Sequence, residues 1–91
     1  MTEDTHRLRV TGPARRVLDR LPAGAAAAVA EFLIGDLVAG PRRVGKQLRG
    51  ELSGTWAARR GPYRVVFEID DAVPEVVVLR IDHRADVYRR R

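Results

Sequence analysis

The chain has 91 residues, which suffice for one hydrophobic core and exclude a second, so we expect a single domain spanning residues 1–91. It has no cysteine, which excludes disulfides and thiolate metal sites, and no apolar run near the roughly 20 residues that a membrane-spanning helix needs. We therefore expect a cytoplasmic protein with no membrane partner. The net charge of +5 is unevenly placed, because seven cations between residues 42 and 64 face the single acid Glu51. Such a field favours a polyanion, although solubility alone explains the charge equally well.

The first half of the chain predicts one strand and two helices. Residues 6–10 alternate polar and apolar side chains, as a half-buried strand does. Thr11 is placed to cap a helix that Pro22 ends. A second helix is predicted from there to about Ala39, where Gly40 and a proline follow. Two helices with so tight a joint form an antiparallel hairpin, which needs a flat element to cover.

The second half predicts that flat element. Residues 55–60 are predicted as a strand, and a Gly-Pro turn separates them from residues 63–69, which alternate strongly. The valine-rich residues 75–82 are typical of a buried strand at or near the centre of a sheet. The predicted fold is α+β: an N-terminal strand and a two-helix antiparallel hairpin, packed on a sheet that a three-strand antiparallel meander completes.

Meander geometry brings basic side chains from distant strand ends to one end of the sheet, with the acidic turn at Asp70 and Asp71 at the other. A tight turn would set Arg59 opposite Arg64, a like-charge pair that a bound phosphate would stabilise. The alternative is that both arginines point into water or pair with acids such as Glu51 or Asp86. The residues predicted to converge are Arg59, Arg60, Arg64, His83 and Arg84.

A basic segment before the second predicted strand could extend this site as a rim that follows a phosphate backbone. The cations predicted to bind RNA are Arg42, Arg43, Lys46, Arg49 and Arg60. His83 could transfer a proton, and Tyr88 could stack on a base or act as acid or base. No carboxylate pair, nucleophile with its base, phosphate-binding glycine loop or metal-ligand cluster is evident, so no metal or cofactor is expected. RNA cleavage needs none of these, because the ribose 2′-hydroxyl is itself a nucleophile.

Three ordered motifs resemble a known family. They are L-R-G at residues 48–50, W-x-x-R-x-G-x-Y-R at residues 56–64, and H-R-x-D-V-Y at residues 83–88. Together with the two-helix segment they resemble toxins of the RelE/ParE superfamily, and most nearly the RelE-type mRNA interferases of high-GC bacteria. The resemblance covers nearly the whole chain.

The resemblance implies that this chain is the toxin of a type II toxin-antitoxin system. RelE-type toxins enter the ribosomal A site, cleave mRNA by 2′-hydroxyl attack without a metal, and are inhibited by a cognate RelB-type antitoxin. Matched residue by residue, Arg59, Arg64 and Arg84 would be the cations at the phosphate and the transition state, and Tyr88 would orient or stack on the substrate. His83 occupies a position that is often basic in the family.

The chain departs from the family pattern on the second predicted strand, where the best-studied members carry lysines that transfer protons. This chain has Ala57 and Ala58 there. The general base is therefore open: His83 or Tyr88 takes the role, ribosomal RNA assists, or cleavage is slow.

Two other functions remain open within the same fold. One is a ParE-type inhibitor of DNA gyrase, and the other is a catalytically weak module that binds its antitoxin and co-represses their promoter. The antitoxin could cover apolar helix positions such as Val17, Leu21 and Leu33, or lie over the sheet edge. Formation of a homodimer is also left open.

Overall fold

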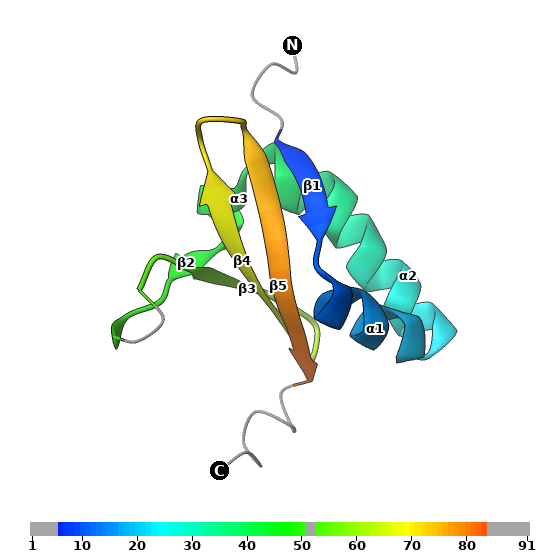
Figure 1. Ribbon diagram of the computed structural model, residues 1–91. Helices are drawn as coiled ribbons and strands as arrows, with labels where there is room; N and C mark the ends of the chain where they lie inside the picture. The colour runs from blue at the N-terminus through cyan, green and yellow to red at the C-terminus, as the bar shows by residue number, and fades with distance from the viewer. Residues whose placement is uncertain (1–5, 51–52, 84–91) are drawn as a thin grey trace.

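A five-stranded sheet in the order β1-β5-β4-β3-β2 forms one layer of the molecule, and helices cover one of its faces (Figure 1). The structure is a computed structural model that describes residues 6–50 and 53–83. No helix in these two ranges is long and apolar enough to cross a membrane. The elements are β1 (Arg7–Val10), α1 (Gly12–Arg20), α2 (Ala23–Phe32), a π-helical turn (Leu33–Leu37), α3 (Pro41–Val44), β2 (Lys46–Gln47), β3 (Trp56–Arg60), β4 (Tyr63–Asp70) and β5 (Glu75–His83).

The predicted α+β fold and its meander are confirmed. Strands β3, β4 and β5 pair antiparallel in sequence order, and β1 adds to β5 as a parallel neighbour. The valine-rich strand β5 thus lies next to the central strand β4, as its composition predicts. Helix α3 and the two-residue strand β2, which pairs with β3, were not predicted.

The two predicted helices are present, with two differences in detail. The hydroxyl of Thr11 does not cap α1: it donates to the carbonyl oxygen of Leu79 at 3.1 Å, so it ties the start of the helix to β5 instead. The second helix does reach residue 39, but its backbone widens into a π-helical turn at Leu33–Leu37. Leu33 is only 2% exposed, so the prediction that an antitoxin covers this side chain is wrong.

The core lies between the helices and the face of the sheet that they cover. It is built mainly from aliphatic side chains, whose removal from water is the main force that holds the two layers together. Phe67 is the largest of the side chains that are fully buried there. The other fully buried large side chains are Leu33, Leu37, Val29, Val65, Val76 and Val78.

A β-bulge decides which side chains of β5 face the helices. Val66 pairs with Arg80 while Phe67 pairs with Val78, so β5 has one extra residue between the two pairs. Beyond the bulge the alternation is shifted: the buried Ile81 faces the core, whereas Arg80 lies with Val66 on the face that the helices leave open. At the end of β5 that carries the predicted site, each side chain therefore lies on the opposite face from the one that the alternation in the first part of β5 predicts.

Candidate active site

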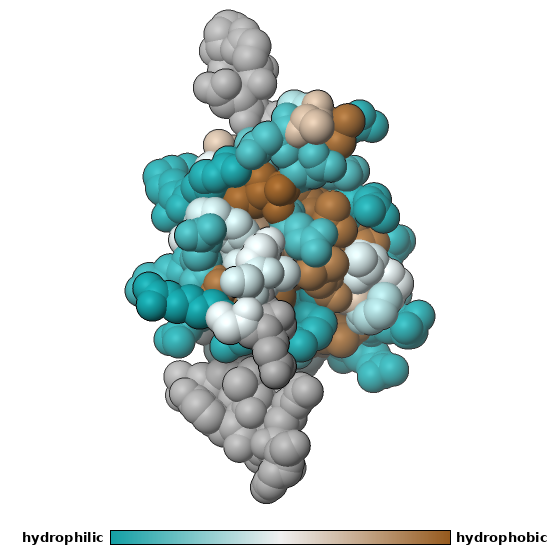
Figure 2. Space-filling model, turned by 60° about the vertical axis from the view of Figure 1, so that its left-hand side comes forward, coloured by the Kyte–Doolittle hydropathy of each residue, from teal (hydrophilic) through white to brown (hydrophobic). Residues whose placement is uncertain are grey.

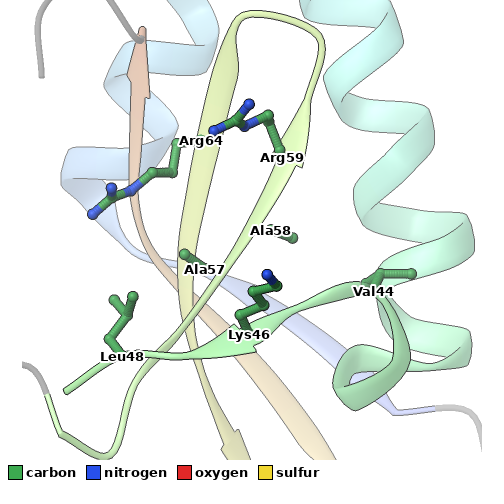
Figure 3. A pocket seen from close by; sticks show the side chains of 7 residues that line it. All are labelled: Val44, Lys46, Leu48, Ala57, Ala58, Arg59 and Arg64. Carbon is green, nitrogen blue, oxygen red and sulfur yellow. The ribbon is translucent and has the colours of Figure 1, made fainter.

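Arg59 and Arg64 lie directly opposite each other on β3 and β4, as the tight turn between these strands predicts. The buried Ala58 and Val65 beside them face the core, so the alternation of strand side chains puts both arginines on the open face of the sheet. Figure 3 shows the two guanidinium groups projecting from adjacent strands. Two like charges in this position destabilise the free protein and favour an anion between them.

Lys46 brings a third cation to the same face from β2. It pairs with Ala57, which precedes Arg59 by two residues and so shares its face. The small side chain of Ala57 leaves room between these cations, and Figure 3 shows the lysine side chain directed into that room. The result is a hollow of about 460 Å³, in the size range of ligand sites. Its lining residues are Val44, Lys46, Leu48, Ala57, Ala58, Arg59 and Arg64.

Within the described part of the chain, no lining side chain neutralises the positive charge of the hollow. None of the lining residues is acidic, and Arg64 makes no ion pair with another described residue. Its Nε atom is buried without a hydrogen-bond partner, which is a costly state for a charged donor. Asp82 lies opposite Arg64 on β5, but its carboxylate accepts hydrogen bonds from Nε and Nη2 of Arg80 at 3.1 and 2.7 Å. The described lining of the hollow thus carries positive charge without an acidic side chain of its own.

Arg60 and His83 reach the predicted end of the sheet but lie on its other face. Arg60 pairs with Tyr63, which in turn pairs with His83, and the rings of Tyr63 and His83 meet edge to face with centroids 5.2 Å apart. Arg60 lines a separate hollow of about 270 Å³ with alanines of α2. The prediction that these two residues meet Arg59 and Arg64 at one end of the sheet is therefore confirmed, but they do not share a face with them, because neighbouring strand residues point to opposite faces and the bulge shifts β5.

Most of the predicted basic rim also lies elsewhere. Arg42 donates to both carboxylate oxygens of Asp71, at 3.3 and 2.7 Å, in the turn at the far end of β4 from Arg64. Its guanidinium carbon lies 5.8 Å from the ring centroid of Trp56. Arg43 folds back over Gly40, and Arg49 is exposed just beyond β2. Of the four cations predicted for this segment, only Lys46 lines the hollow.

The Arg42–Asp71 pair predicts a pH-dependent contribution to stability. The hydrogen bond from Arg42 holds the pKa of Asp71 below its ordinary value of 3.8. A lowered pKa means that the stabilisation is present above the unfolded value and is lost as the pH falls through the folded one. We expect Asp71→Asn to lower the melting temperature slightly at neutral pH and to match the wild type in strong acid. Melting curves between pH 2 and 7 measure the difference in melting temperature between Asp71→Asn and the wild type. A difference that does not change with pH would contradict the role of the Asp71 carboxylate.

Several predicted residues lie outside the described residues, namely Arg84 and Tyr88 among the site residues and Glu51 and Asp86 among their alternative partners. The roles of Arg84 and Tyr88 stay predictions. Within residues 6–50 and 53–83, no group of three or more His, Asp or Glu side chains is arranged to hold a metal ion. The sequence did not identify the Arg80–Asp82 pair, although two opposite charges two residues apart on a strand share one face and so signal it.

The chain is similar to known toxins over most of its length. The family model described as "ParE toxin of type II toxin-antitoxin system, parDE" matches residues 8–88. Toxin RelG of Mycobacterium tuberculosis is 58% identical over 83 residues, which cover 91% of this chain and 95% of that toxin. Toxin RelE of the same organism is 44% identical over 90 residues, which cover 98% and 93%.

Solved structures give the same result. The toxin-antitoxin complex RelBE2 of M. tuberculosis contains a chain that is 54% identical, with a TM-score of 0.85 over 88% of this chain and 99% of that one. The Escherichia coli RelBE complex, at 20% identity and a TM-score of 0.72 over 86% and 95%, shares the fold. With a family model and close relatives that span nearly all of its length, the chain belongs to the RelE/ParE family and is the toxin component of a type II toxin-antitoxin system.

Proposed function

We propose that this toxin is an endoribonuclease that cleaves mRNA in the ribosomal A site by attack of a ribose 2′-hydroxyl, without a metal ion, and so stops translation. The observation that carries the proposal is the hollow in which Arg59, Arg64 and Lys46 meet and whose described lining residues include no acid. Relatives named RelG and RelE, at 58% and 44% identity, support the same activity.

Cleavage of RNA by its own 2′-hydroxyl requires few groups from the protein. The nucleophile belongs to the RNA, so the protein must align the 2′-oxygen with the phosphorus and stabilise the negative charge that develops on the phosphorane. Arg59 and Arg64 suit this task, because a guanidinium stays protonated and donates two parallel hydrogen bonds to phosphate oxygens. Their mutual repulsion is relieved as negative charge grows between them, which favours the transition state over the free enzyme.

Primer extension on a translated mRNA after induction of the toxin tests the proposal. We expect new 5′ ends within the translated region at positions that follow the reading frame. The matched control is the same mRNA without its start codon, which should stay intact because no ribosome presents it. Growth arrest without any cuts in the translated mRNA would overturn the proposal.

A second function has one observation in its favour, since the matching family model is described as a ParE toxin. A ParE-type protein would inhibit DNA gyrase and leave RNA intact. The same induction separates the two: a ribonuclease stops protein synthesis at once, whereas a gyrase inhibitor causes DNA damage and filamentation first. The arginine pair beside Lys46 favours the ribonuclease.

The partner that we propose is a RelB-type antitoxin acting in the cytoplasm, because the solved relative at 54% identity is a RelBE2 toxin-antitoxin complex. The described surface has apolar side chains that a partner could cover: Ile34 is 67% exposed and Val73 is 49% exposed. Figure 2 shows hydrophobic surface between the hydrophilic side chains of one face. Co-purification of the toxin with the product of the adjacent gene tests this pairing.

A further inference from the structure

We propose that Lys46 is the general acid of the cleavage reaction and protonates the leaving 5′-oxygen. This inference rests on the proposed function and assigns a proton donor among the described residues of the site. Three observations carry it: the residue type, the place of Lys46 in the sheet, and the composition of the hollow.

Lys46 is the single lysine of the sequence, and all other basic residues are arginine. An arginine side chain keeps its proton throughout the physiological range, so it can bind a phosphate but cannot give up a proton to it. A lysine ammonium can do both, and lysines serve as acids and bases in enzyme sites. The one basic residue of this chain that differs from the rest thus lines the hollow that holds Arg59 and Arg64.

The sheet fixes where the ammonium group can act. Lys46 pairs with Ala57, so Arg59 is its diagonal neighbour, at a spacing of roughly 7–8 Å between backbones. Lys46 and Arg59 therefore line the same hollow from neighbouring strands. The backbone on either side is anchored, because the N–H of Gly45 donates to the carbonyl of Pro41 at 3.1 Å and that of Leu48 to the carbonyl of Thr55 at 3.0 Å. Figure 3 shows the lysine side chain rising from this anchored segment toward the arginines.

No other lining residue within residues 6–50 and 53–83 can move a proton. Apart from Lys46 they are two arginines and four aliphatic residues, without a carboxylate, imidazole, hydroxyl or thiol. His83, the other described residue predicted for proton transfer, lies on the opposite face against Tyr63. Lys46 is therefore the described lining residue that can give up a proton to the leaving oxygen.

The reaction balances with Lys46 in this role. The 2′-oxygen bonds to phosphorus and its proton passes to water, while Arg59 and Arg64 hold the non-bridging oxygens. The bond between phosphorus and the 5′-oxygen breaks, and that oxygen takes the proton from Nζ of Lys46. The products are a 2′,3′-cyclic phosphate and a 5′-hydroxyl, and water returns a proton to the lysine amine.

Single-turnover cleavage on programmed ribosomes tests the assignment with two mRNAs that differ in one atom. The first has the ordinary 5′-oxygen at the scissile linkage, and the second has a bridging 5′-sulfur, which leaves as a thiolate without needing a proton. We expect Lys46→Arg, which keeps the positive charge, to slow cleavage of the oxygen substrate on the order of 10²-fold or more. The same variant should cleave the sulfur substrate within a few-fold of the wild-type rate.

Two controls separate this role from others. Arg64→Ala should be slow on both substrates, because its charge is needed whatever group leaves, and Arg15→Ala, an exposed position on α1, should behave as the wild type on both. Equal loss on the two substrates, or full activity of Lys46→Arg on the oxygen substrate, would overturn the role of Lys46 and leave the ribonuclease intact. A wild-type protein that cuts neither mRNA would instead overturn the proposed function itself.

Discussion

Arg64→Ala is expected to reduce mRNA cleavage by about 10²–10³-fold, and with it to abolish the growth arrest that the toxin causes. Arg64 is half-buried in the hollow, opposite Arg59, and has no acidic partner among the described residues. Its charge is therefore already desolvated and oriented before substrate binds, which is the condition under which one donor contributes most to the transition state. Single-turnover rates on programmed ribosomes measure the chemical loss, and colony formation under induction measures the cellular one.

The loss should not come from unfolding. Removal of Arg64 relieves its repulsion with Arg59 and removes the unpaired Nε atom, so we expect the melting temperature to stay the same or to rise. Antitoxin binding should be retained, which makes the purified complex a test of correct folding. Arg15→Ala removes the same charge from the surface of α1 and should remain fully toxic. An Arg64→Ala protein that still arrests growth would show that the hollow is not the active site.

Phe67→Ala should have the largest effect on stability, lowering the free energy of unfolding by about 3–5 kcal/mol. The ring is fully buried on the central strand β4 and is the largest of the fully buried side chains. Its removal leaves a cavity between the sheet and the helices that the rigid neighbours cannot fill. A domain of this size has only about 5–15 kcal/mol in total, so much of the protein would be unfolded near 37 °C. Urea unfolding followed by circular dichroism measures the change.

Two variants make this measurement specific to the core. Phe67→Leu keeps most of the volume and should cost clearly less than the alanine variant. Val73→Ala shortens a side chain that is 49% exposed in the β4–β5 turn and should leave the unfolding midpoint nearly unchanged. If Phe67→Ala unfolded at the wild-type urea concentration, the packing of the core as described would be wrong.

Local patterns were sufficient to predict the meander and the central pair of the site. Alternation in residues 63–69 identifies β4. A two-residue Gly-Pro turn allows only one register between β3 and β4, and this register places Arg59 opposite Arg64. The same alternation should have excluded Arg60 from their face, because adjacent residues of a strand point in opposite directions. His83 lies on the other face for another reason: the bulge at Val66 and Phe67 adds a residue to β5, and nothing in the local sequence marks it.

The basic segment after Gly40 could not be placed from sequence. A two-residue strand has too few positions to show a period, so the sequence gives no sign that Lys46 enters the sheet. Arg42 is separated from its partner Asp71 by 29 residues, and only tertiary structure brings them together. Four cations that appear equivalent in the sequence thus have different environments, and the one inside the hollow is the lysine.

The close approach of Gly45 to Phe67 links the core to the segment that leads into the candidate site. A Cβ at Gly45 would lie 2.7 Å from the tip of the Phe67 ring and 3.1 Å from the carbonyl oxygen of Pro41, so any larger residue must displace one of them. Lys46 is the next residue along the chain, and its position therefore depends on the volume of a buried ring. In evolutionary terms the two positions should vary together, so that homologues with a side chain at position 45 would carry a smaller residue at position 67.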